Sequence, residues 1–144
     1  MTVPAVTSLI TLGVRDVAAS TRFYQALGFE LSPASVEGEV SFFRTAGARL
    51  ALWGQEDLAV DAQAERRAAD GFRGVSLAIN VEAAAAVDDA LRVAAAVGAS
   101  IPRPAQATEW GGYNGYFADP DGHLWEIAHN PFWPLGPDGL PHLP

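Results

Sequence analysis

The sequence contains no cysteine, and this absence excludes thiolate metal ligands, a thiol nucleophile and any disulfide framework. Any metal or catalytic site must therefore use oxygen or imidazole groups, and imidazole is supplied only by His123, His129 and His142. No apolar run approaches the roughly 18 to 20 residues that a membrane span requires, and no basic segment leads into an apolar one. We therefore expect a cytoplasmic protein with no membrane partner.

Basic residues are scarce as well. Nine Lys and Arg residues stand against 17 Asp and Glu, which gives a formal net charge of -8. The basic residues are scattered, and no cluster is longer than Arg66 and Arg67. Because a nucleic-acid surface must neutralise several phosphates with grouped cations, we do not expect DNA or RNA as a partner. The net negative charge does not by itself indicate a partner, because many proteins are acidic simply for solubility.

The first half of the chain shows one strand, one helix and three more strands. Residues 8–14 alternate with the two-residue period of a strand. Apolar residues recur at helical spacing over 17–27, with Asp16 placed as the N-cap and Gly28 as the C-terminal cap. Short strand-like runs separated by glycine-containing turns follow at 29–31, 40–45 and 49–53. The predicted order is βαβββ.

The second half repeats this order. Residues 75–81 alternate as a strand, and an alanine-rich helix over 82–97 ends at Gly98. Further strands are predicted at 100–102, 115–118 and 124–128. The sequence "DPDG" joins the last two and suits a type I turn. Two modules of one design are therefore present, and the fold class is α+β.

The 144 residues, 49% of them hydrophobic, are enough for one domain with a packed core. Within it we place module one at 6–54, a charged surface linker at 55–73, module two at 74–130 and a proline-rich tail at 131–144. The prolines exclude the tail from a helix or a sheet interior, so it should lie over the surface, anchored by Phe132 and Trp133.

Three motifs stand out within the paired modules: "VRD" at 14–16, "FYQALGFEL" at 23–31 and "YFADPDGHLWEI" at 116–127. Together with the paired modules they resemble the vicinal oxygen chelate superfamily, and the resemblance covers roughly 6–130. That superfamily includes glyoxalase I, extradiol dioxygenases, fosfomycin-resistance enzymes and bleomycin-binding proteins. The resemblance implies eight strands curled into an incomplete barrel with helices outside, a ligand on the concave side, and a homodimer whose cavities often use both subunits.

Catalytic relatives hold a divalent metal at four strand positions, and the resemblance places Leu9, Ala51, Ser76 and Glu126 there. A metal needs three or four protein ligands; Leu and Ala have no lone pair, and a neutral Ser hydroxyl is a poor ligand. Strand alternation puts His123 on the face opposite Glu126, and the same holds for His129, which we interpret as a hydrogen-bonded structural residue. We therefore predict no metal and no other cofactor.

Alternation also predicts a cavity face that mixes small, aromatic and hydrogen-bonding side chains, as ligand pockets do. The opposite face is uniformly apolar and should pack under the helices; its residues are Ile10, Leu12, Leu50, Leu52, Val75, Leu77 and Ile79. The glycines of "EWGGYNGYF" should allow sharp turns or close approach near three further aromatic residues. The predicted cavity residues are Leu9, Thr11, Phe42, Ala51, Trp53, Ser76, Ala78, Asn80, Trp110, Tyr113, Tyr116, Leu124 and Glu126.

These patterns leave three functions open, the last being that Trp53 and Tyr116 fill the cavity themselves and the protein acts only through partners. The first is metal-independent binding of a small, partly aromatic molecule in a cavity near the dimer interface. The second is a glyoxalase-like isomerase or lyase, or a dioxygenase, that uses a divalent metal or Glu126 as general base. A third interpretation of Glu126 is structural, with the carboxylate satisfied by the backbone or by Asn80.

Overall fold

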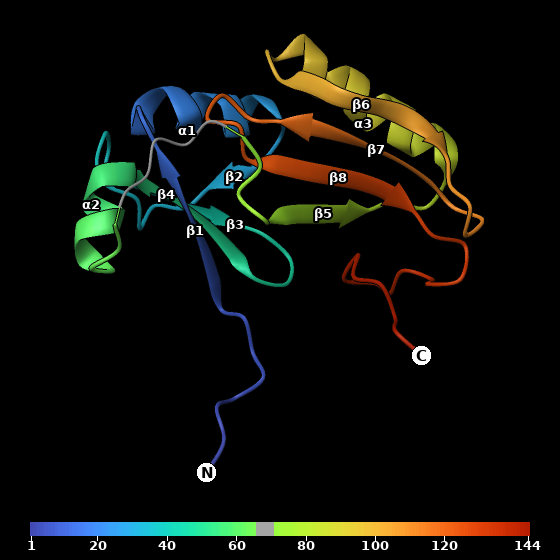
Figure 1. The fold of residues 1–144 in the computed structure, drawn as a ribbon, viewed down its shortest axis with the longest axis horizontal. Helices are drawn as coiled ribbons and strands as arrows, with labels where there is room; N and C mark the ends of the chain where they lie inside the picture. The colour runs from blue at the N-terminus through green and yellow to red at the C-terminus, as the bar shows by residue number, and fades with distance from the viewer. Residues whose placement is uncertain (66–70) are drawn as a thin grey trace. The chain divides into compact units, whose positions relative to one another are not determined.

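The computed structural model describes residues 1–65 and 71–144. The chain divides into two compact units, Met1–Arg66 and Arg67–Pro144, and each is described by itself (Figure 1). The strands and helices of the first unit are β1 (Leu9–Val14), α1 (Val17–Ala26), β2 (Glu30–Leu31), β3 (Val40–Arg44), β4 (Arg49–Gly54) and α2 (Gln55–Asp61). Its four-stranded sheet has the order β1-β4-β3-β2, in which β1 runs parallel to β4 and the other pairs are antiparallel.

Helix α1 begins and ends where the sequence predicts. The carboxylate of Asp16 accepts a hydrogen bond from the backbone N–H of Ala19 at 2.9 Å, which satisfies one of the free donors of the first turn. Gly28 follows the helix with φ of 103°, a left-handed conformation that favours glycine. The helix buries Phe23 and Tyr24 against the sheet, and the Tyr24 ring lies 5.9 Å from that of Phe43.

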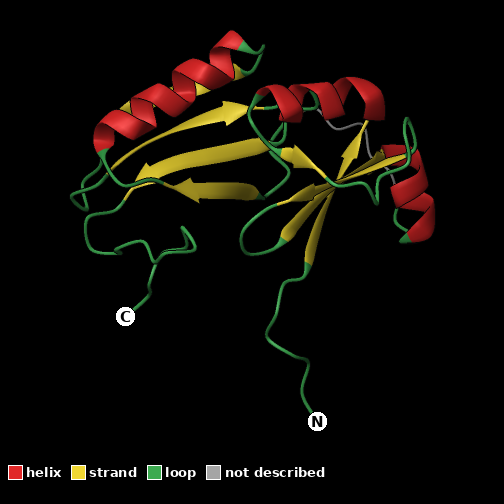
Figure 2. Ribbon diagram, turned by 180° about the vertical axis from the view of Figure 1, so that it is seen from behind, coloured by secondary structure: helices red, strands yellow, loops and turns green. Residues whose placement is uncertain are grey.

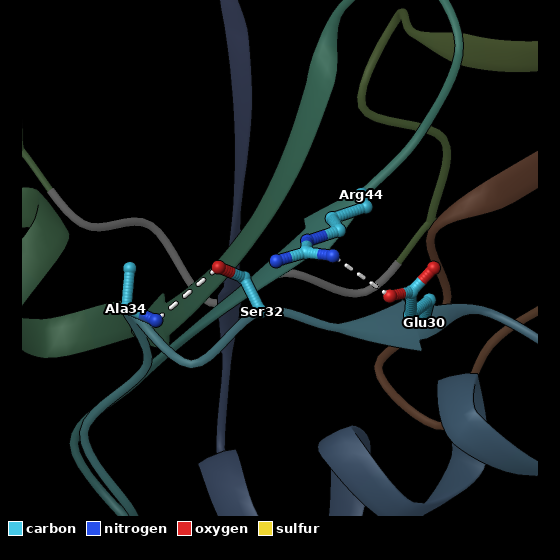
Figure 3. Close-up of polar contacts among 4 residues, drawn as sticks. All are labelled: Glu30, Ser32, Ala34 and Arg44. Carbon is cyan, nitrogen blue, oxygen red and sulfur yellow. Dashed lines mark hydrogen bonds and ion pairs between the residues drawn. The ribbon is translucent and has the colours of Figure 1, made fainter.

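The edge of the first sheet is polar. Strand β2 pairs Glu30 with Arg44 of β3, and the guanidinium donates to the carboxylate at 3.0 Å (Figure 3). The Ser32 hydroxyl accepts from the backbone N–H of Ala34 at 3.2 Å in the turn that follows (Figure 3). Both partners of the ion pair are largely exposed, so it specifies strand pairing more than it stabilises the fold.

Helix α2 lies inside the segment predicted as a linker. It follows β4 directly, and Glu56 and Asp57 occupy its first turn, where carboxylates favour the positive end of the helix dipole. It also packs on β1: a Cβ at Gly13 would come within 3.2 Å of the Cα of Gln55. The expected linker therefore starts as a helix, and its residues 66–70 lie outside the described residues.

The second unit repeats the strand order of the first sheet. Figure 2 shows its strands with a helix lying along them. Its elements are β5 (Ser76–Asn80), α3 (Ala84–Ala96), β6 (Ser100–Ala107), β7 (Tyr113–Ala118) and β8 (Leu124–His129). The order is β5-β8-β7-β6, with β5 parallel to β8. The α+β fold class with two βαβββ modules is confirmed, and both sheets are open rather than closed barrels.

Strand β6 is longer than predicted. The sequence suggests a strand that ends at Pro102, but β6 continues through Pro104 to Ala107. The physical reason is its position: β6 is an edge strand that pairs only with β7, and an edge strand tolerates residues that cannot donate a backbone hydrogen bond. The continuation brings Arg103 into the sheet opposite Tyr116.

The "DPDG" turn forms as predicted. The N–H of Gly122 donates to the carbonyl of Asp119 at 3.0 Å, and the Asp119 carboxylate accepts from the N–H groups of Asp121 and His123 at 2.9 and 2.8 Å. Asp119 is 5% exposed, so these bonds are sheltered from water. The turn holds β7 and β8 in the register that pairs Tyr116 with Glu126.

Helix α3 covers one face of the second sheet. Val87, Leu91 and Ala94 of the helix are buried, as are Phe117 and Trp125, whose rings stack 6.1 Å apart. The expectation that Val75 packs under the helix is wrong, because Val75 precedes β5 and is exposed. None of the described helices combines the length and apolar character needed to cross a membrane.

The proline-rich tail is more ordered than an extended strap. Leu135 pairs with Pro141, the N–H of Gly136 donates to Leu140 at 2.9 Å, and the N–H of His142 donates to Pro134 at 3.0 Å. These bonds form a small hairpin of its own, outside the sheet, as the prolines require.

Candidate functional site

The face of the second sheet opposite α3 carries the polar groups. The register pairs Ala78 with Glu126, Glu126 with Tyr116, and Tyr116 with Arg103, so these four side chains lie in a row across β5, β8, β7 and β6. Paired residues share a face because side chains alternate along each strand. Asn114 lies two residues before Tyr116 and therefore faces the same way.

A pocket of about 460 Å³ opens beside Glu126. It is lined by Ala78, Asn80, Trp110, Glu126, Ala128, Asn130, Phe132 and Trp133. Three of these side chains are aromatic, one is an acid and none is basic. The pocket is therefore apolar-walled with a single carboxylate and two side-chain amides as its polar groups.

Glycines let the aromatic walls lie close to the backbone. A Cβ at Gly112 would fall 1.9 Å from the Trp110 ring, so the indole lies directly over this glycine. A Cβ at Gly111 would fall 3.4 Å from the Phe132 ring, and Gly111 itself has φ of 93°. The loop between β6 and β7 and the start of the tail are thus brought together to form the wall.

Glu126 is held by a chain of side-chain hydrogen bonds. Its Oε2 accepts from Nδ2 of Asn114 at 2.6 Å, and Oδ1 of Asn114 accepts from Nη2 of Arg103. The Arg103 guanidinium also lies 5.3 Å from the centre of the Tyr116 ring, within the range of a cation–π contact. Asn114 is 6% exposed, so the side chain at the centre of this series of hydrogen bonds is shielded from water.

Four of the predicted cavity residues line this pocket. They are Ala78, Asn80, Trp110 and Glu126. Ser76, Tyr116 and Leu124 share the face but do not line the pocket. The anchors that we expected for the tail, Phe132 and Trp133, are pocket walls.

Tyr113 lies elsewhere, which corrects the prediction for this residue. It is one residue out of step with Asn114, so it points to the helix side, where its hydroxyl donates to Asp88 of α3 at 2.8 Å. That hydrogen bond, with the negative charge of Asp88, raises the pKa of Tyr113 above its usual 10.0.

The remaining predicted residues belong to the first unit. Thr11 pairs with Ala51 and Ala51 with Phe42, while Leu9 and Trp53 lie two residues along the same strands, so all five share one face as predicted. Ala51 is buried, and Trp53 lines a separate cavity of about 780 Å³ beside Arg15 and Asp57.

Sequence reasoning missed the two residues that hold Glu126. Arg103 was hidden because the prolines beside it suggested the end of a strand. Asn114 could have been predicted from the sequence, because it lies two residues from Tyr116 in a strand-like run and must therefore share its face. Asn80 is the side-chain partner that the sequence suggests for the carboxylate, but the structure gives that role to Asn114.

The residues that the resemblance places at the metal positions do not fit a divalent ion. Leu9 and Ala51 offer no lone pair, and Glu126 already uses one oxygen for Asn114. No group of three or more His, Asp or Glu residues suited to a metal occurs among residues 1–65 and 71–144. His129 faces away from Glu126, and its Nδ1–H donates to the carbonyl of Val81 at 3.2 Å, so it is a structural residue as predicted.

Comparisons with known proteins agree with this architecture. The family model described as the Glyoxalase/Bleomycin resistance protein/Dioxygenase superfamily matches residues 7–127. A glyoxalase-related enzyme from Fulvimarina pelagi is 38% identical, with 96% of this chain and 98% of that chain covered and a TM-score of 0.85. A glyoxalase/bleomycin resistance protein/dioxygenase from Nocardioides is 26% identical, with coverages of 90% and 85% and a TM-score of 0.74.

A lactoylglutathione lyase from Agrobacterium tumefaciens is 24% identical, with 90% of this chain and 97% of that chain covered and a TM-score of 0.66. At this identity the likeness shows the fold alone. Curated proteins gave no match.

Proposed function

Because the chain belongs to the glyoxalase/bleomycin resistance protein/dioxygenase superfamily, we propose that it binds a small, partly aromatic organic molecule, without metal, in the pocket around Glu126. This fold carries both enzymes and binding proteins, so the chemistry of the pocket must decide between them. The proposal depends on one observation: the pocket combines three aromatic side chains with a single carboxylate. The described residues around it do not suit a metal.

The size and walls of the pocket support this ligand class. Its volume of about 460 Å³ falls within the roughly 300 to 1,000 Å³ of small-molecule sites. Trp110, Phe132 and Trp133 offer flat apolar surfaces on which a ring can stack. Asn80, Asn130 and Glu126 are the polar groups that would orient it.

We further propose a cytoplasmic homodimer with an interface near this pocket. Strand β5, which carries Ala78 and Asn80, is an edge strand of its sheet. Phe72 and Val75 beside it are 75% and 63% exposed. An edge with exposed apolar side chains is commonly covered by another chain, and the molar mass from light scattering would test this.

An enzyme is the second candidate, and the likeness to a glyoxalase-related enzyme at 38% identity favours it. Glu126 would act as a general base: one oxygen is held by Asn114, and the other is available to take a proton from a bound molecule. A metal-independent isomerase or lyase would use Glu126 in this way to abstract a proton, whereas a dioxygenase requires a metal that these residues do not suit.

The experiment is a titration of ¹⁵N-labelled protein with a panel of aromatic fragments, observed at the tryptophan indole N–H signals. Binding in the pocket should move the signals of Trp110 and Trp133 and leave that of Trp53, in the other unit, unchanged. The variant Trp110→Leu should weaken the binding, and the matched variant Trp53→Leu should not. A panel that moves neither pocket signal would contradict the proposal.

A further inference from the structure

Arg103 is oriented toward Asn114, and this fixes which way the Asn114 amide lies. A guanidinium has only N–H donors, so it must face the oxygen of the amide, Oδ1. The amide nitrogen, Nδ2, is then forced toward Glu126, to which it donates at 2.6 Å. The direction of the second hydrogen bond therefore follows from the first.

These two hydrogen bonds leave one carboxylate oxygen of Glu126 as an acceptor for a ligand. Oε2 of Glu126 is occupied by Asn114, and Glu126 makes no other hydrogen bond with residues 1–65 and 71–144. Glu126 lines the pocket, and its Oε1 is the carboxylate oxygen that Asn114 does not occupy, so we take it as the acceptor offered to a bound molecule. An ionised carboxylate only accepts hydrogen bonds, so the complementary ligand group is a donor.

Arg103 also has a feature that packing alone does not explain. Its Nη1 is buried and has no hydrogen-bond partner in the described part of the chain. A buried donor without a partner is costly, and a methionine would fill the same space over the Tyr116 ring. The guanidinium is therefore placed for its hydrogen bond to Asn114.

We propose that Arg103 and Asn114 are positioning residues that turn Glu126 into a one-sided hydrogen-bond acceptor, so that the pocket selects aromatic molecules carrying an N–H or O–H at the ring edge. This rests on the proposed function of the pocket. Arg103 touches no ligand in this scheme; it acts through Asn114.

The replacement Glu126→Gln separates this scheme from simple loss of charge. With Asn114 held by Arg103, Nδ2 still faces position 126, so the introduced glutamine must turn its oxygen to Asn114 and its NH₂ group to the pocket. The pocket then offers a donor in place of an acceptor. If Arg103 is also replaced by Met, the Asn114 amide is released to turn over, and the glutamine oxygen can face the pocket again.

Two probes of the same shape measure this selectivity. Indole has an N–H donor, and benzofuran has an oxygen at the same position. The protein should bind indole about tenfold or more tighter than benzofuran, as expected for a hydrogen bond to a charged group. Glu126→Gln should reduce this ratio to about one, and Arg103→Met with Glu126→Gln should raise it again.

Two matched variants serve as controls. Arg103→Lys with Glu126→Gln keeps a donor next to Asn114 and should stay at a ratio of about one. Arg92→Met with Glu126→Gln removes an exposed arginine that pairs with Asp89 on α3, and it should also stay at about one. Equal ratios in the Arg103→Met and Arg92→Met double variants would overturn the proposal.

A second readout needs no probe. In Glu126→Gln the side-chain NH₂ protons of Asn114 should exchange slowly with water, and those of the introduced glutamine should exchange rapidly. Adding Arg103→Met should bring the two exchange rates closer together. An unchanged exchange pattern would refute the positioning role whatever the ligand. If the exchange pattern is as expected but neither probe moves the Trp110 signal, the proposed binding fails while the positioning of Glu126 stands.

Discussion

Gly112→Ala is the sharpest test of how the pocket wall is built. The backbone of Gly112 lies outside the left-handed region, so alanine is allowed there and only space is at issue. The new methyl group would lie 1.9 and 2.0 Å from two carbons of the Trp110 ring and 2.8 Å from the carbonyl oxygen of His129. Carbon atoms in contact are about 3.5 to 4.0 Å apart, so the indole must withdraw by roughly 1.5 Å or more.

The cost can be estimated from the groups that must move. Trp110 is partly exposed and can shift, but the His129 carbonyl belongs to β8 and cannot move without the strand. Overpacking of this kind costs about 1 to 3 kcal/mol. For a chain of this length that corresponds to a fall in Tm of about 3 to 10 °C.

Thermal unfolding followed by circular dichroism would measure the fall, and the indole signal of Trp110 would report the displaced ring. We also expect weaker binding of indole, because the wall it stacks on has moved. Gly54→Ala is the milder comparison: its methyl group meets only the flexible carboxylate of Asp57, at 3.1 Å, and Gly54 is the N-cap of α2, so Tm should fall by less than in Gly112→Ala. A Gly112→Ala protein with the original Tm and an unmoved Trp110 signal would refute the reasoning.

Three further predictions concern the supporting structure. Asp119→Ala should lower the free energy of unfolding by about 2 to 4 kcal/mol in urea titrations, because two backbone donors lose their acceptor, whereas Asp119→Asn should cost less. Asp16→Ala removes the N-cap of α1 and should cost about 0.5 to 2 kcal/mol by the same assay, with Asp16→Asn nearly neutral. Tyr113 should ionise above pH 10.0 in absorbance titrations, and Asp88→Asn should reduce the shift, leaving the part that burial causes. Since the raised pKa favours the protonated folded state, its contribution to stability is present below pH 10.0 and is lost as pH rises through the folded pKa.

The topology was readable from the sequence because local signals agreed with one another. Asp16 and Gly28 bound a helix with apolar spacing, and "DPDG" joins two strands in a turn whose bonds formed as expected. The end of β6 was not readable from local signals. Whether Pro102 and Pro104 stop a strand depends on whether that strand lies at an edge, and this is a property of the whole sheet.

The candidate site was predictable to the extent that it follows strand alternation. Alternation placed Ala78, Asn80 and Glu126 on one face, and the register confirms this. Alternation also shows why the prediction for Tyr113 was wrong. The residue was assigned to the cavity by its aromatic character and its neighbours, but the cavity face of β7 carries Asn114 and Tyr116, and Tyr113 lies on the other face.

Contacts between distant segments could not be read from the sequence. The approach of Phe132 to Gly111 and the bond between Arg103 and Asn114 join parts of the chain whose separation has no fixed relation to a strand or helix period. Such contacts depend on loop paths, which local propensity does not determine.

The measurement that tests the central claim most directly is the affinity for indole before and after metal removal. Protein treated with EDTA, and the same protein resupplied with Zn²⁺, Ni²⁺ or Mn²⁺, should bind indole with one Kd, observed at the Trp110 and Trp133 signals. Glu126→Gln should weaken that binding equally in every sample. Binding that disappears with EDTA, returns with one of these metals and is lost from Glu126→Gln would contradict the account.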